Sequence, residues 1–169
     1  AMKAPRYLVQ TRDLSGVAAA AGPFLEAARA LGDRLGPLLW QFAPQHKADA
    51  GALVDLMATL PRQTGGRTLQ HAFHVRNAGC HGVALVAGAR AHNVALVIED
   101  SEDGPLHGDV TADFVYARIE RSQARLRAGL TVPVQQRWAA RAQQWRNGAT
   151  PDDLPLSAPA APGHPREVF

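Results

Sequence analysis

PFLEAARALGDRLGPLLWQFAP, residues 23–44, places a helical pattern directly before a strand pattern. Its first half is amphipathic at helical spacing, and Pro23 suits the first turn of a helix. The apolar side chains that share one helical face are Phe24, Leu25, Ala28, Leu31 and Leu35. Gly36-Pro37 stops the helix, and the apolar run that Pro44 closes is typical of a buried strand. The stretch therefore predicts a helix over 23–35 and a strand over 37–44.

The same alternation continues on both sides of this stretch. Before it, residues 2–10 are predicted to be extended, because Pro5 disfavours a helix there. After it, further strands are predicted over 69–76, 94–98 and 113–120. Helices are predicted over 49–60, over 79–92 and along the stripe Val134, Trp138, Ala142 and Trp145, which ends at Asn147-Gly148. Loops rich in glycine and polar residues are predicted over 62–67 and 101–112.

Repeated strand–helix alternation implies right-handed crossovers, parallel strands and helices on the outside. The pattern fits an open doubly wound sheet or a (β/α) barrel, and we expect a partial TIM-barrel-like fold over 1–148. A Pro-rich loop over 149–165 and the start of a further strand over 166–169 should follow. A complete eight-fold barrel usually needs about 250 residues. We therefore expect either a piece of a longer protein or an incomplete barrel, in which self-association could cover the open sheet edges.

The composition excludes several classes of protein. The 169 residues are 46% hydrophobic and 20% charged, which argues against wholesale disorder. No apolar run approaches the roughly 20 residues of a membrane helix. The single cysteine, Cys80, excludes an internal disulfide and a multi-cysteine zinc site. Together these features favour a cytoplasmic protein without a membrane partner.

Several segments in collinear order, from residue 2 to about 148, resemble one known family. They are Lys3-Ala4-Pro5-Arg6, Leu35 to Pro44, His74-Val75-Arg76-Asn77, Val94-Ala95-Leu96-Val97 with Asp100-Ser101, Thr111 to Arg118, and the helix with Trp138. This series is similar to the domain of unknown function 72 family, also called YecE-like. The resemblance implies a TIM-barrel-like fold whose biochemical activity is not established.

The chain departs from the family pattern at four places. The family's opening strand with its Gly-Trp segment would precede Met2, and its closing strand would follow Phe169. His74 and Asn77 stand where the family usually carries Glu and His. Ile119-Glu120-Arg121 replaces the usual Leu-His-Gly. These departures remove the acid–base groups that the resemblance would otherwise imply.

Candidate site residues lie where the predicted strands end, because ligands gather at the carboxyl ends of parallel strands. The inward-facing set is Lys3, Gln41, His74, Arg76, Asp100, Tyr116 and Arg118. Lys3, Arg76 and Arg118 could hold a small anionic or phosphorylated ligand, with Gln41 and Tyr116 orienting it. Asp100 and His74 are the candidate catalytic acid–base groups. The alternative is that the arginines pair with Glu99 and Asp100 in a buried ion network that only stabilises the barrel.

Other chemistries receive less support. His71 and His74, three residues apart on a strand, face opposite sides, so no metal site is predicted. The residues identify no cofactor. The Arg-rich region 118–146, with Trp138 and Trp145, could form a nucleic-acid-binding module, but both tryptophans lie on the apolar helix stripe. A non-catalytic interaction protein is the remaining alternative.

Overall fold

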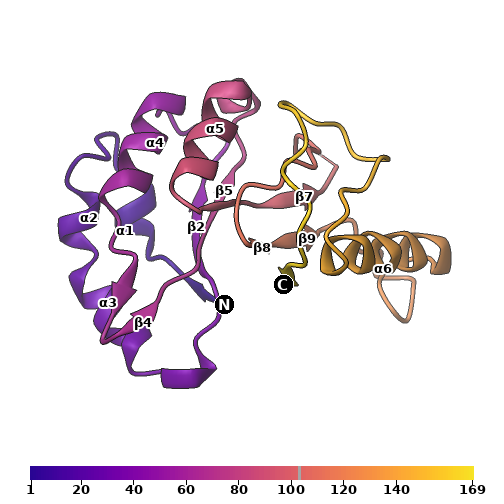
Figure 1. Ribbon diagram of the computed structural model, residues 1–169, viewed down its shortest axis with the longest axis horizontal. Coiled ribbons are helices and arrows are strands. Elements are labelled where there is room, and N and C mark those ends of the chain that lie inside the picture. Colours follow the sequence, from indigo (N-terminus) through magenta and orange to yellow (C-terminus); the bar gives the residue numbers. More distant parts are fainter. Residues whose placement is uncertain (103) are drawn as a thin grey trace.

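The structure is a computed structural model that describes residues 1–102 and 104–169. The core strands are β1 (Met2–Lys3), β2 (Leu38–Phe42), β5 (His71–Val75), β6 (Ala95–Leu96), β7 (Ile98–Asp100), β8 (Phe114–Val115), β9 (Ala117–Ile119) and β10 (Glu167–Val168). The helices are α1 (Arg6–Val9), α2 (Val17–Ala20), α3 (Gly22–Arg29), α4 (Ala50–Thr59), α5 (Val83–Ala91) and α6 (Val132–Arg146). Figure 1 shows strands and helices alternating along the chain.

The strands are parallel and lie side by side in chain order. One sheet has the order β1-β2-β5-β6, and the pairs β7–β9 and β10–β8 are also parallel. Val97 alone separates β6 from β7, and Tyr116 alone separates β8 from β9. The amide of Val97 donates to the carbonyl of Phe73 at 2.9 Å. The amide of Ile98 donates to the carbonyl of Tyr116 at 3.0 Å. The short pairs therefore continue the larger sheet as one curved parallel surface, which confirms the predicted parallel α/β class.

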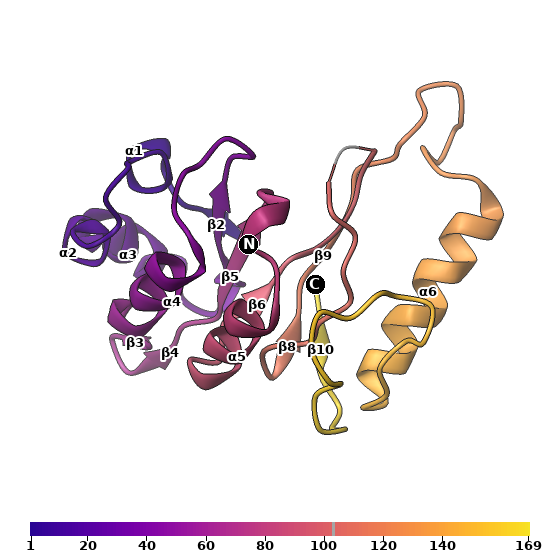
Figure 2. The ribbon, with the colours of Figure 1, turned by 90° about the horizontal axis from the view of Figure 1, so that it is seen from above.

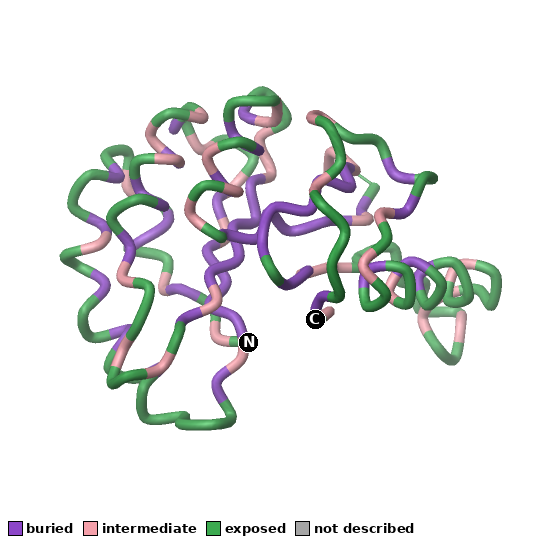
Figure 3. Tube along the Cα trace, in the orientation of Figure 1, coloured by how far each residue is buried: buried purple, intermediate pink, exposed green. Residues whose placement is uncertain are grey.

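Large apolar side chains on the outer face of the strands pack against the helices. Trp40, Phe42 and Phe73 are buried against the helical residues, among them Leu53 and Leu85. A second apolar cluster joins the end of the sheet to α6 through Ile98, Val115, Trp138 and Trp145. Seen from above, α1 to α5 lie beside the first strands and α6 lies beside the last (Figure 2). Figure 3 shows that burial is concentrated along the strands between these helices.

The inner face carries a smaller apolar cluster. It consists of Leu39, Ala72, Ala95, Val97, Ala112 and Phe114, with Tyr116 packed against it. These residues alternate with those of the outer face, as the two-residue period of a strand requires. Beyond this cluster, toward the carboxyl ends of the strands, the inner face becomes polar.

Several predicted elements differ from those observed. Residues 2–10 are not extended throughout, because β1 ends at Lys3 and Pro5 precedes the short helix α1. The predicted helix 23–35 ends at Arg29 and continues as a 3-10 turn over Gly32–Arg34.

The predicted loop 62–67 contains a small antiparallel hairpin, β3 (Gln63–Thr64) with β4 (Arg67–Thr68). Gly65 and Gly66 form its turn with φ values of 54° and 79°, a backbone conformation that glycine adopts easily.

Candidate functional site

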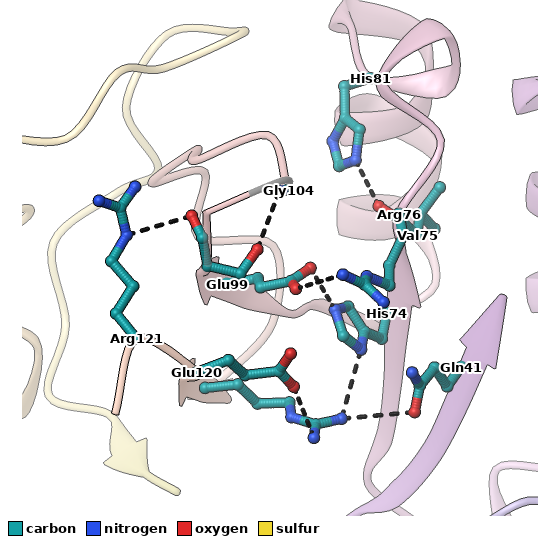
Figure 4. A network of polar contacts seen from close by, with 11 residues as sticks. Gln41, His74, Val75, Arg76, His81, Glu99, Gly104, Glu120 and Arg121 are labelled. Carbon is teal, nitrogen blue, oxygen red and sulfur yellow. Dashed lines mark hydrogen bonds and ion pairs between the residues drawn. The ribbon is translucent and has the colours of Figure 1, made fainter. Parts of the chain in front are cut away.

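Four predicted site residues meet at the carboxyl ends of neighbouring strands. Gln41 and His74 are the next-to-last residues of β2 and β5. Arg76 follows β5, and Arg118 lies in β9. The register explains the meeting, since Gln41 is opposite His74 and Arg118 is opposite Glu99 of β7. Figure 4 shows His74 and Arg76 pointing toward Glu99, with Gln41 and Glu120 at the edge of the same cluster.

A buried His74–Glu99 pair forms the centre of the cluster. Nε2 of His74 lies 2.6 Å from Oε2 of Glu99, and the two residues are only 1% and 2% exposed. Burial lowers the pKa of His74 and outweighs the opposing effect of the Glu99 carboxylate. Burial raises the pKa of Glu99, but hydrogen bonds from His74 and Ser101 outweigh it and leave that pKa below its ordinary value. We infer a neutral imidazole that donates its Nε2 proton to an ionised carboxylate.

Two partly exposed arginines flank the pair. Nη2 of Arg76 lies 3.3 Å from Oε1 of Glu99, without hydrogen-bond geometry. Nη1 of Arg118 lies 3.4 Å from Nδ1 of His74 and 3.4 Å from Oε1 of Gln41, and its Nη2 contacts Glu120 at 2.7 Å. The side chains of Arg76 and Arg118 are 24% and 31% exposed. Nδ1 of His74, the unprotonated ring nitrogen, therefore faces the space that Arg118 occupies.

Polar atoms remain unpartnered at the centre of this cluster. Nε of Arg76 and Oε1 of Glu99 are buried, and neither has a hydrogen-bond partner among the described residues. One is a donor and the other an acceptor. Buried polar atoms normally have a hydrogen-bond partner, so these two atoms are exceptions within the described residues.

Asp100 does not point inward, which corrects the sequence prediction. Its Oδ2 accepts a hydrogen bond from Nε1 of Trp138 at 3.0 Å, and its Oδ1 contacts Nε of Arg121 at 2.7 Å. Strand β7 extends to Asp100, so this residue shares the outer face with Ile98, which packs against α6. The inward carboxylate is its neighbour Glu99.

Lys3 and Tyr116 lie on the inner face without joining the polar cluster. Lys3 is opposite Leu39 in the register and is exposed. Tyr116 is half-buried and packs against the apolar inner cluster. Among residues 1–102 and 104–169, neither side chain forms a hydrogen bond or ion pair with Arg76, His74 or Arg118.

Sequence reasoning did not place two carboxylates in the candidate site. It named Glu99 only as a partner of the arginines in a buried ion network, and it gave Glu120 no role. Glu99 and Glu120 carry the negative charges that face Arg76 and Arg118. The alternation of side chains along a strand could have identified Glu99, because this residue lies two positions after Val97, whose side chain faces inward. With these carboxylates, the cluster is close to charge balance rather than strongly cationic.

The structure gives no support for metal binding or nucleic-acid binding by the residues considered for these roles. The described part of the chain holds no group of three or more His, Cys, Asp or Glu side chains placed to bind a metal. Trp138 and Trp145 are 6% and 0% exposed, so their faces are unavailable for stacking on bases. Every helix within the described residues is too short or too polar to cross a bilayer.

Comparison with known proteins identifies the family. The family model described as "Protein of unknown function DUF72" matches residues 1–154. No curated protein matches the chain. A solved structure, that of a DUF72 family protein (TM1631) from Thermotoga maritima MSB8, is similar with a TM-score of 0.53 and 20% identity.

That match covers 70% of this chain and 49% of the Thermotoga chain, so the present chain spans about half the length of the solved protein. At this identity, the likeness concerns the fold alone. The family match agrees with the series of segments found in the sequence, and the chain belongs to the DUF72 family of proteins of unknown function.

Proposed function

We propose that the chain forms an open portion of a TIM-barrel-like (β/α) fold that binds a small anionic or phosphorylated ligand at the carboxyl ends of its strands. Parallel strands in chain order, with helices on their outer face, support the barrel assignment. In such folds, ligands bind where the carboxyl ends of the strands converge. The His74–Glu99 cluster lies at that end.

The observation that carries the proposal is the placement of two partly exposed arginines around a buried histidine–carboxylate pair. Arg118 presents a planar guanidinium that can contact a phosphate or carboxylate with two parallel hydrogen bonds. Its present partner, Glu120, has a side chain that is 30% exposed, so an anionic ligand can replace it. The unpartnered Nε of Arg76 supplies a further donor. In this arrangement, Gln41 orients the ligand, and Lys3 and Tyr116 contribute from the inner face.

His74 is the acid–base group of this proposal, and Glu99 takes the role first given to Asp100. Glu99 accepts a hydrogen bond from Nε2 of His74 and so keeps the proton on that nitrogen. The other ring nitrogen, Nδ1, is then unprotonated, can act as a base and faces Arg118. A ligand held by Arg118 would lie within reach of that nitrogen. Glu99 acts through His74 as a positioning residue.

Ligand binding can be tested by thermal unfolding in the presence of inorganic phosphate and sugar phosphates, against sodium chloride at equal ionic strength. A ligand at 100 times its Kd stabilises by about 2.7 kcal/mol, which should raise the Tm by roughly 5–10 °C. The double variant R76A/R118A should lose this increase. The matched control R125A/R127A removes two exposed arginines of the loop after β9 and should keep it.

A second variant keeps the test decisive if the double variant R76A/R118A does not fold. Glu120→Gln removes the carboxylate that competes for Arg118 and should tighten phosphate binding several-fold. An unchanged Tm of the wild type with every anion, or a Glu120→Gln variant that binds no better, would overturn the proposal.

One observation favours an alternative in which the cluster has only a structural, non-catalytic role. Arg76 and Arg118 each already lie beside a carboxylate, as an ion network that only stabilises the sheet requires. This alternative predicts that no anion raises the Tm and that the R76A/R118A variant is merely less stable than the wild type.

A further inference from the structure

A polar cavity lies on the outer face of the sheet, separate from the His74–Glu99 cluster. Its volume is about 350 Å³, and it lies between the amino-terminal half of α6 and the ends of β7 and β9. Asp100 contributes to its wall, whereas Glu99 faces the opposite side of the same strand. The volume falls within the usual range of roughly 300–1,000 Å³ for small-molecule sites.

Three guanidinium groups line this cavity, those of Arg121, Arg137 and Arg141. Asp100 contacts Nε of Arg121 at 2.7 Å, and Asp153 accepts bonds from Nε and Nη2 of Arg141 at distances from 2.9 to 3.2 Å. Within the part of the chain that the structure describes, Arg137 has no ion-pair partner. Among the described residues, three cations face two carboxylates at the cavity, which leaves one positive charge without a counter-ion there.

The start of α6 adds partial positive charge at the same place. Thr131 precedes the first residue of this 15-residue helix and also lines the cavity, but its side chain makes no capping hydrogen bond. The amide groups of a first helical turn have no partner within the helix and favour a nearby anion. The arginine charges and the helix end therefore act in the same direction.

The remaining wall is largely apolar, apart from Gln123. Leu106, Leu130 and Val134 line it, together with Trp138. The guanidinium of Arg141 lies 4.5 Å from the centre of the Trp138 ring, and both residues are 6% exposed. The indole Nε1 of Trp138 donates to Asp100, which fixes the ring. Such preformed walls lose little conformational entropy when a ligand binds.

We propose that this cavity binds a small organic anion that carries an aromatic or apolar portion, such as an aryl phosphate or aryl carboxylate. The anionic group lies beside Arg137 and the start of α6, and the apolar portion contacts Leu130 and Val134, close to Trp138. This site is independent of the ligand site proposed at the inner face. It also gives the Arg-rich region 118–146 a small-molecule role rather than a nucleic-acid role.

The test is a titration of the full chain with phenyl phosphate and, separately, with benzoate, followed by NMR of the tryptophan indole N–H groups. The Trp138 resonance, assigned with a Trp138→Phe variant, should shift saturably, while that of the fully buried Trp40 stays unchanged. Whichever of the two probes binds more tightly identifies phosphate or carboxylate as the preferred anion. Inorganic phosphate alone and phenol alone should bind at least tenfold more weakly than phenyl phosphate.

Matched variants decide the role of Arg137. Arg137→Ala should weaken binding of the preferred probe at least tenfold, whereas Arg146→Ala removes the same charge from the exposed end of α6 and should leave binding unchanged. The R76A/R118A variant should also retain the Trp138 shift, which separates this site from the inner one. Absence of a saturable Trp138 shift with both probes, or an equal effect of Arg137→Ala and Arg146→Ala, would overturn the inference.

Discussion

His107 is a buried histidine outside both proposed sites. Its ring lies against that of His81, with centroids 4.4 Å apart, and it is 6% exposed. Its Nδ1 has no hydrogen-bond partner among the described residues, and the nearest carboxylate, Asp109, is 4.0 Å away. Burial, and secondarily His81, lower the pKa of His107 to about 4. The folded protein therefore holds this imidazole neutral well below pH 6.

This lowered pKa predicts a loss of stability in mild acid. Between the folded pKa of about 4 and the unfolded value of 6.5, the unfolded chain binds more protons, so the free energy of unfolding falls as the pH falls. The contribution of His107 between pH 7.5 and 4.5 is about 2 kcal/mol. Urea unfolding of a His107→Leu variant should show a smaller loss between these pH values. The half-exposed His92, changed to Leu, should keep the wild-type dependence, and an equal effect of both variants would contradict the assignment.

The contact between α4 and α5 depends on one glycine. Gly88 lies in the interior of α5, and a Cβ atom at this position would clash with both methyl carbons of Val54 in α4. The two helices therefore approach closely because α5 has no side chain at this point. Both helices cover the same outer face of the sheet.

Gly88→Ala should destabilise the protein despite the higher helix propensity of alanine. The propensity gain is about 1 kcal/mol, whereas overpacking costs about 1–3 kcal/mol, so we expect a net loss near 1 kcal/mol. Val54→Ala in the same chain should recover part of it, which a double-mutant cycle measured by urea unfolding would show as a coupling energy. Additive effects of the two substitutions would exclude the contact as the cause.

At the scale of the whole molecule, Arg166 is one of several contacts that attach the last 21 residues to the rest of the chain. The segment from Ala149 to Pro165 has no helix or strand, and β10 follows it beside β8. Arg166 is 5% exposed and donates to the carbonyls of Ala112, Pro162 and His164 at 2.8–3.2 Å. One side chain therefore ties the loop, β10 and the residues before β8 together.

Removal of this side chain should loosen the carboxyl-terminal region selectively. Arg166→Ala leaves three carbonyl groups without their donor, which we expect to cost about 3 kcal/mol. Hydrogen exchange should accelerate most in β8 and β10, while β2 and β5 retain most of their protection. Arg146→Ala, on the exposed end of α6, is the control and should leave exchange unchanged. Uniform acceleration over all strands would show that Arg166 supports the whole fold instead.

Local patterns in the sequence predict the parallel α/β class and much of the inner face. Apolar periodicity identified β2, α4, β5 and α6, because each buries a regular stripe or run that local spacing reveals. Strand parity placed Gln41, His74, Arg76 and Arg118 on one face, and their side chains meet there. These properties are local, since the period of a strand or helix is set by the backbone of a few neighbouring residues.

How far each element extends, and which charged groups meet, depend on how the folded chain packs. Strand β7 runs two residues beyond the predicted 94–98 because it pairs with β9, and this places Glu99 inward and Asp100 against Trp138. Pro5 ends β1, which pairs only with β2 among the described strands, so the predicted strand 2–10 gives way to α1. Arg141 is buried beneath Asp153 although its spacing from Arg137 is typical of a solvated helix face. The physical reason is that pairing and burial depend on segments distant in the chain, which local patterns do not contain.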